Sequence, residues 1–124
     1  MAVVASCSSA SAVGNGSTDR AAERLMRQLS SPHQSSAEGL TRAAVYFTRN
    51  EAESAVLEAE QLKPGKIEDP LARMVFRFHD PGSLSGFSRS DPVTACYEAR
   101  FNYYGVVGSA HRVSCPKLAQ PLTP

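Results

Sequence analysis

The residues of this chain that could carry hydrolytic chemistry are His79 and His111, together with Asp80 and the many serines. His79 and Asp80 adjoin at the end of a strand-like segment, and a histidine oriented by a carboxylate is the base that activates a serine nucleophile. No GxSxG elbow occurs in the sequence. Neighbouring strand residues also point to opposite faces, so we do not expect His79 and Asp80 to hydrogen-bond. These two observations argue against catalysis. A small hydrolase using His79 or His111 accordingly stays an alternative function and is not the favoured one.

A metal site is the second chemistry that the residue types allow. His79, His111 and Glu98 are donors that would have to converge on one face of a sheet. The chain has no CxxC or HxxxH spacing of the kind that builds a metal centre. We therefore predict no metal and no cofactor, and we expect Glu98 and Arg100 to form exposed cross-strand ion pairs.

Aromatic residues crowd the segment that follows Thr94. Tyr97, Phe101 and Tyr103 share one strand parity, which predicts a place in the core. Tyr104 has the opposite parity and is expected on the solvent face of the sheet. An exposed tyrosine near arginines is typical of a protein-binding hot spot. Tyr104, with Arg100 and Arg77, is therefore the candidate binding face.

Two of the three cysteines flank the same segment. Cys96 and Cys115 lie near the ends of a predicted hairpin, where antiparallel pairing would bring them together as a disulfide. Turn-forming residues point to a turn near Gly108, so this pairing needs a bulge or an uneven loop. A disulfide implies an oxidising compartment. The alternative is a pair of buried free thiols in a cytoplasmic regulatory or inhibitor module.

The elements that position these residues follow from apolar spacing. Periodicity of three to four residues predicts helices over about 19–29 and 36–48, the second opened by a capping box between Ser35 and Glu38. Alternating residues predict strands over 72–80, 93–103 and the return segment 111–115. Residues 51–62 fit a helix or a strand, and 81–92 is expected to be a flexible connector of Gly, Ser and Pro.

The fold class expected from this order is α+β. Two or three short helices pack on a three- or four-stranded antiparallel β-meander that carries one hairpin disulfide. Residues 1–17 are rich in Ser, Gly and Ala and are expected to form a disordered arm. Residues 18–116 form the single domain, and 117–124 form a Pro-rich tail that we expect to be extended and frayed.

The overall charge excludes some partners. Thirteen basic and twelve acidic residues give a formal net charge of +1, without the basic stripe of a nucleic-acid-binding protein. No apolar run approaches the roughly 18 residues of a transmembrane helix. We therefore expect no nucleic-acid partner, and contact with a membrane only through an N-terminal anchor.

The N-terminal residues suggest what that anchor would be. The stretch Val4-Ala5-Ser6-Cys7 fits the small-residue pattern before the lipidated cysteine of bacterial lipoproteins. With the Ser-rich arm and the Cys96/Cys115 pair, it resembles the exported lipoproteins and membrane-tethered ectodomains of actinobacteria. The resemblance implies that Cys7 is a lipid anchor and that the domain is secreted or attached to the cell envelope. The resemblance does not identify any active-site residue in this chain.

These observations favour a non-enzymatic, extracytoplasmic binding or structural module. Its expected partner is an unidentified protein or a component of the cell envelope.

Overall fold

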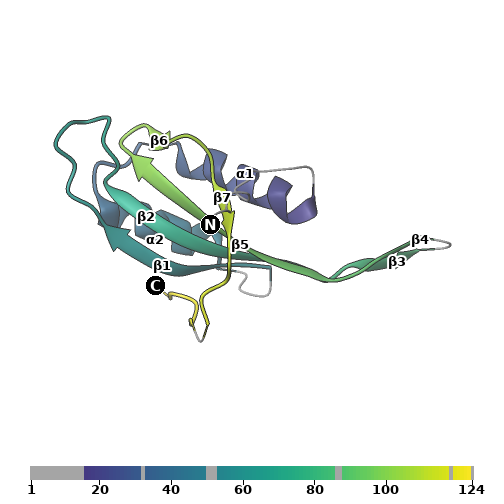
Figure 1. Cartoon of the computed structure of the whole chain (residues 1–124). Coiled ribbons are helices and arrows are strands. Elements are labelled where there is room, and N and C mark those ends of the chain that lie inside the picture. The colour runs from purple at the N-terminus through teal and green to yellow at the C-terminus, as the bar shows by residue number, and fades with distance from the viewer. Residues whose placement is uncertain (1–15, 32, 50–52, 86–87, 118, 124) are drawn as a thin grey trace, which may run out of the picture.

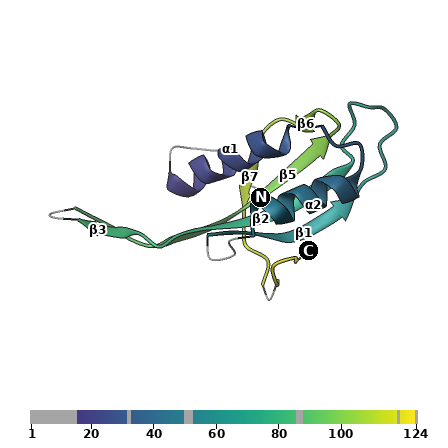
Figure 2. The same ribbon diagram turned by 180° about the vertical axis from the view of Figure 1, so that it is seen from behind.

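The structure is a computed structural model that describes residues 16–31, 33–49, 53–85, 88–117 and 119–123. Two helices, α1 (Ser17–Leu29) and α2 (Ala37–Phe47), precede all the strands. The strands are β1 (Ser54–Gln61), β2 (Ala72–Asp80), β3 (Ser83–Ser85), β4 (Ser88–Ser90), β5 (Val93–Asn102), β6 (Gly105–Val106) and β7 (His111–Val113). Both helices lie on one face of an antiparallel sheet (Figures 1 and 2), which confirms the predicted α+β class.

The main sheet is a meander in which β1, β2, β5 and β6 lie side by side, and β7 also pairs with β5. The central pair is β2 with β5, aligned from Ala72 opposite Phe101 to Asp80 opposite Val93. The face that carries the helices holds the core, and the other face is called the outer face below.

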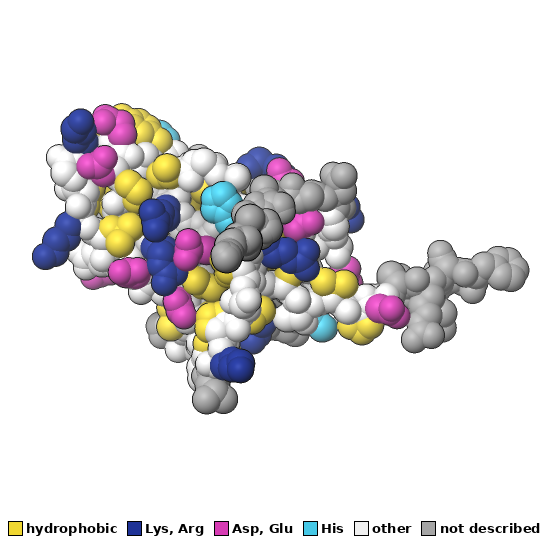
Figure 3. Space-filling view, viewed as in Figure 1, with side chains coloured by type: hydrophobic (Ala, Val, Ile, Leu, Met, Phe, Trp, Pro, Cys, Tyr) yellow, Lys and Arg dark blue, Asp and Glu magenta, His cyan; other side chains and the backbone are white. Residues whose placement is uncertain are grey.

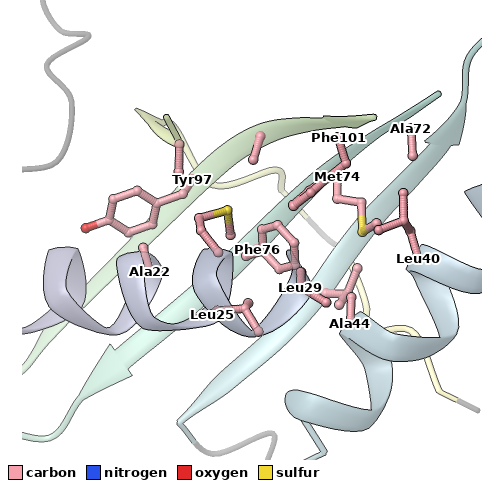
Figure 4. Packing of buried hydrophobic residues seen from close by; sticks show 14 of the residues in the cluster. Ala22, Leu25, Leu29, Leu40, Ala44, Ala72, Met74, Phe76, Tyr97 and Phe101 are labelled. Atoms are coloured by element: carbon pink, nitrogen blue, oxygen red, sulfur yellow. The ribbon is translucent and has the colours of Figure 1, made fainter. Parts of the chain in front are cut away.

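The core forms because strand alternation and helical periodicity select the same face. In β2, Met74, Phe76 and Phe78 are buried against the helices, as their alternation predicted. From β5, Tyr97 and Phe101 point to the same side (Figure 4). The helices contribute a stripe of apolar residues to this core: Ala22, Leu25, Met26, Leu29, Leu40, Ala44 and Val45. Each large side chain of this kind stabilises the fold by about 1.5–3 kcal/mol when fully buried.

The helix boundaries differ slightly from those expected. Helix α1 begins at Ser17, two positions before Asp19, and Gly16 is its N-cap. Helix α2 is capped by Ser36, whose Oγ accepts a hydrogen bond from the Gly39 backbone N–H at 3.0 Å. The predicted capping box between Ser35 and Glu38 was therefore wrong by one residue, and Glu38 pairs with Arg42 instead.

The ambiguous stretch from 51 to 62 contains a strand. Strand β1 pairs with β2 at the edge of the sheet, and its alignment shifts between Val56 and Glu58. Val56 lies in the core on the helix side and Leu57 in a second cluster on the outer face, and the bulge then places Glu58 opposite Val75, on the same outer face as Leu57. A bulge opposes two residues to one and so breaks the parity of a strand. For this reason alternation alone could not identify β1.

The connector of residues 81–92 was expected to be flexible, and this was wrong for its described part. Strands β3 and β4 pair as a hairpin that continues β2 and β5 (Figures 1 and 2), with Ser83 opposite Ser90. Asp80 starts this excursion by accepting a hydrogen bond from the Gly82 backbone N–H at 2.9 Å. The result is a ribbon that projects beyond the helices.

Cys96 and Cys115 form the predicted disulfide, with their Cα atoms 5.1 Å apart. The hairpin turns at Tyr103 and Tyr104, because Asn102 pairs with Gly105, so the expected turn near Gly108 was wrong. The expected irregularity is confirmed in the return segment, where β6 is opposite Phe101 and Asn102, whereas β7 is opposite Cys96, Tyr97 and Glu98. The ladder partner of Cys96 is Val113, and the disulfide joins it to Cys115 just beyond the ladder.

The Pro-rich tail lies against the sheet. Ala119 packs on the buried cluster of Ala55, Leu57, Val75 and Cys96 on the outer face. Further along, the Leu122 backbone N–H donates to the Val56 carbonyl at 2.8 Å. Among its described residues the tail forms neither helix nor strand, and these two contacts join it to the sheet; the expected fraying stays a prediction. None of the helices described is long and apolar enough to cross a bilayer.

Candidate functional site

The exposed aromatic residue Tyr104 lies in the tight turn between β5 and β6. Asn102 orders this turn with both ends of its side-chain amide. Its Oδ1 accepts from the Tyr104 backbone N–H, and its Nδ2 donates to the Glu68 carbonyl, each at 2.8 Å. On the other side of the turn, Gly105 has a φ of 122° and lies so close to Ser30 that an added Cβ would come within 2.3 Å of its Oγ. The turn is therefore held on one side by the loop that contains Glu68 and on the other side by Ser30 at the end of α1.

Three rings meet at this turn. The centroid of the His33 ring lies 4.9 Å from that of Tyr103 and 5.8 Å from that of Tyr104, and the two tyrosine rings are 5.2 Å apart. Tyr104 is 54% exposed, and His33 is exposed as well. We call His33, Tyr103 and Tyr104 the aromatic tip.

The loop between β1 and β2 extends the surface beside the aromatic tip. Glu68, whose carbonyl binds Asn102, follows Ile67, which is 53% exposed. Asp69 shapes the same loop by accepting hydrogen bonds from the backbone N–H groups of Gly65 and Lys66, both at 3.0 Å. Hydrophobic side chains gather at the end of the molecule where Figure 1 labels β6, with charged side chains beside them (Figure 3). The surface is thus apolar and aromatic with a charged margin, and aromatic residues are enriched at protein interfaces in general.

The sequence predicted the exposure of Tyr104 but not its surroundings. Tyr103 was expected in the core, and this was wrong: it is half-buried in the turn and packs on His33. Strand parity stops applying where the two-residue turn begins, so it could not place Tyr103 or predict what Tyr104 contacts. His33 is missed altogether by sequence reasoning, because only folding brings the loop between the helices to this turn.

Arg100 and Arg77 do not join Tyr104. Both lie on the outer face, where Arg100 is opposite Arg73 and Arg77 is opposite Cys96. Four strand positions separate Arg73 from Arg77, which corresponds to about 13 Å along β2. The candidate face made of Tyr104, Arg100 and Arg77 is thus divided between the turn and the outer face.

The outer face is dominated by one ion-pair network. Arg73 contacts Glu58 and Glu60, each at 3.0 Å, and Glu98 at 3.3 Å. Glu98 was expected in an exposed cross-strand ion pair; it makes a cross-strand pair with Arg73, but both side chains are only partly exposed, and none of the described ion pairs includes Arg100. Positive and negative side chains accordingly mix on this face, which Figure 3 views from the front. Because the carboxylates compensate Arg73, the network is better suited to tying strands together than to attracting a charged ligand.

The residues considered for catalysis have separate partners. His79 Nδ1 lies 2.8 Å from Thr94 Oγ1, whereas Asp80 accepts hydrogen bonds from the Ser17 hydroxyl and the Gly82 backbone N–H. These two hydrogen bonds hold the pKa of Asp80 below its usual value. Serine, histidine and aspartate are close in this region, but their described hydrogen bonds do not form the Ser-His-Asp chain of a hydrolase.

The metal donors are also apart. His111 is opposite Glu98 in the β5–β7 ladder, while His79 is opposite Thr94, four positions further along β5. In the parts of the chain that the structure describes, no three His, Cys, Asp or Glu side chains are grouped so as to hold a metal ion. His111 is instead one wall of a shallow hollow with Arg100 and Val107.

A buried polar cluster joins α1 to the sheet, and nothing in the sequence pattern identified it. The Tyr97 hydroxyl donates to Asp19 Oδ1 at 2.5 Å and lies 3.0 Å from Thr18 Oγ1. All three residues are buried. Burial and the bond to Asp19 raise the pKa of Tyr97 above its usual value. We assign this cluster to the fold, since its groups satisfy one another.

Cys7, the candidate lipid anchor, lies outside the described residues. The disulfide is compatible with an extracellular location. No protein-family model matches the chain, and neither the curated proteins nor the solved structures include one that is significantly similar to it.

Proposed function

We propose that this protein is a non-enzymatic, extracytoplasmic module that binds a protein of the cell envelope through its aromatic tip. The observation that carries the proposal is the packing of His33, Tyr103 and Tyr104 into one exposed cluster on an ordered turn. Tyrosine supplies a large contact area with few rotatable bonds, so little conformational entropy is lost when it is buried in a complex.

Preorganisation supports the same interpretation. The amide of Asn102 holds the turn and the loop of Glu68 together, and Gly105 packs against Ser30 on the other side. A loop ordered before binding does not lose that freedom on association, which improves affinity without any new contact. Tyr104 is the expected hot spot, with Tyr103 and His33 holding its ring in place.

Attachment to the envelope would present the tip to its partner. The disulfide fits an oxidising compartment, and a lipidated Cys7 would tether the domain. The residues between Cys7 and Ser17 would then set how far from the membrane the domain can reach. Under this proposal the partner is a membrane-associated or cell-wall-associated protein.

The test is quantitative capture of partners from a cell-envelope extract on the immobilised protein. Tyr104→Ala should abolish capture of a saturable partner, since truncating a hot spot weakens binding by at least about 2 kcal/mol. Tyr46→Ala is the matched control, because Tyr46 is 57% exposed but lies in α2. Equal capture by wild type and both variants would show that the aromatic tip is not the site.

A further inference from the structure

A groove lies between α2 and the C-terminal tail, away from the aromatic tip. Its volume is about 470 Å³, and its lining residues are Thr41, Arg42, Val45, Tyr46, Arg49 and Thr123. Residues 41, 42, 45 and 46 form one stripe along α2, and Arg49 lies just beyond the C-cap of that helix, Thr48. The C-terminal end of the chain runs beside β1 and α2 in Figure 2. The volume lies within the range of roughly 300–1,000 Å³ that is typical of small-molecule sites.

The tail wall of the groove is fastened at two points. The disulfide between Cys96 and Cys115 fixes the start of the tail, and the Leu122 backbone N–H binds the Val56 carbonyl at 2.8 Å just before Thr123. The groove thus does not depend on a loose chain end for its second wall.

The floor of the groove is apolar and offers few hydrogen-bond partners. Most of the carbon surface comes from the ring of Tyr46, which is 57% exposed, whereas Val45 is only 6% exposed and adds an edge. The Thr41 hydroxyl is already used, because it donates to the Ala37 carbonyl at 2.8 Å within α2. A peptide bound here would leave backbone polar groups without partners, which costs free energy, whereas an alkyl chain has none to satisfy.

Two arginines, Arg42 and Arg49, line the groove at opposite ends of this floor. Arg49 places its guanidinium carbon 4.5 Å from the centroid of the Tyr46 ring, and within the described residues it makes no salt bridge. Arg42, which lies within α2, is bound to Glu38 at 3.0 Å. Of the two, Arg49 is therefore the one whose charge is open to an anionic ligand. Its planar fork matches the geometry of a carboxylate.

We propose that this groove binds a single-chain carboxylic amphiphile, with the alkyl chain along the ring of Tyr46 and the carboxylate at Arg49. The site is separate from the aromatic tip and does not depend on the function proposed for that surface. The occupant is the free amphiphile in solution, because the surface is concave and bounded by the tail, whereas a bilayer surface would favour a convex apolar face.

The test is a fluorescence titration of the full chain with dansylundecanoic acid and, in parallel, with its methyl ester. The acid should bind wild type saturably and more tightly than the ester. Arg49→Gln should weaken binding of the acid by about tenfold or more and leave binding of the ester unchanged, since only the charge-assisted contact is lost. Thr41→Phe should weaken both ligands by filling the groove.

Two controls make the outcome specific. Arg112→Glu reverses an exposed charge on β7 and Tyr104→Ala alters the aromatic tip, and neither should change the affinity for the acid. Equal loss of acid and ester binding in Arg49→Gln would contradict the carboxylate contact. Binding to anionic phospholipid vesicles without binding of the free acid would overturn the proposal in favour of a membrane surface.

Discussion

The Tyr97 hydroxyl donates a hydrogen bond to Asp19 Oδ1 at 2.5 Å, joining residues that are 78 positions apart in the sequence. Asp19 also accepts from the Gly16 backbone N–H through Oδ2 at 3.1 Å, so the same carboxylate closes the first turn of α1. One residue thereby fixes both the start of the helix and its position on β5. No buried side-chain nitrogen or oxygen among the described residues lacks a partner.

Tyr97→Phe should destabilise the fold by about 1–3 kcal/mol, because the buried carboxylate of Asp19 loses a donor. Urea unfolding near neutral pH measures this free energy. Tyr46→Phe, which removes a hydroxyl from a residue that is 57% exposed, should change it by less than about 0.5 kcal/mol. Equal effects of the two substitutions would mean that the Tyr97 hydroxyl contributes nothing beyond an exposed one.

Alkaline pH should remove the same contribution. The pKa of Tyr97 is raised in the folded protein above the ordinary value of 10.0. Above that value the unfolded chain loses the phenolic proton while the folded chain keeps it, so the free energy of unfolding falls as pH rises. In a background where Cys7 is Ser, the stability difference between wild type and Tyr97→Phe should be constant near pH 8 and shrink as pH rises past 10.0. A constant difference would contradict the raised pKa.

The α+β class, both helices, the β2 and β5 alternation and the disulfide could be predicted from sequence, because each depends on local periodicity or residue type. The parts that could not be predicted depend on contacts between distant segments. The bulge at Val56 and Glu58 hid a strand, and the turn at Tyr103 and Tyr104 ended the parity argument. His33 reaches the aromatic tip only through tertiary packing, which no spacing of residues shows.

Replacing both Cys96 and Cys115 with Ala should lower stability by about 3 kcal/mol, as expected for a crosslink that closes a loop of this length. The cysteines are 19 positions apart. Since the bond holds the start of the tail, the Leu122 amide should also lose protection from hydrogen exchange. Exchange measured at single residues checks this, with the amide of Phe76 in the core as reference. Unchanged protection at Leu122 would show that the tail is held without the disulfide.

Gly105→Ala should destabilise the protein more than Gly108→Ala, although both glycines have positive φ values, of 122° and 73°. An added Cβ at Gly105 would come within 2.3 Å of Ser30 Oγ, whereas at Gly108 it would have nothing within 4 Å. We expect about 1 kcal/mol for Gly108→Ala from backbone strain, and at least about 1 kcal/mol more for Gly105→Ala from overpacking. Thermal unfolding of the two variants provides the comparison, and equal losses would argue against the close contact with Ser30.

The central claim is that the aromatic tip contacts a partner in the envelope, and photo-crosslinking in intact cells tests it most directly. The protein would carry p-benzoylphenylalanine in place of Tyr104, or, as matched controls, in place of Tyr46 or Arg112. We predict one discrete crosslinked adduct from position 104 that disappears when His33 and Tyr103 are both changed to Ala. Adducts formed only from positions 46 or 112, with none from 104, would contradict the claim.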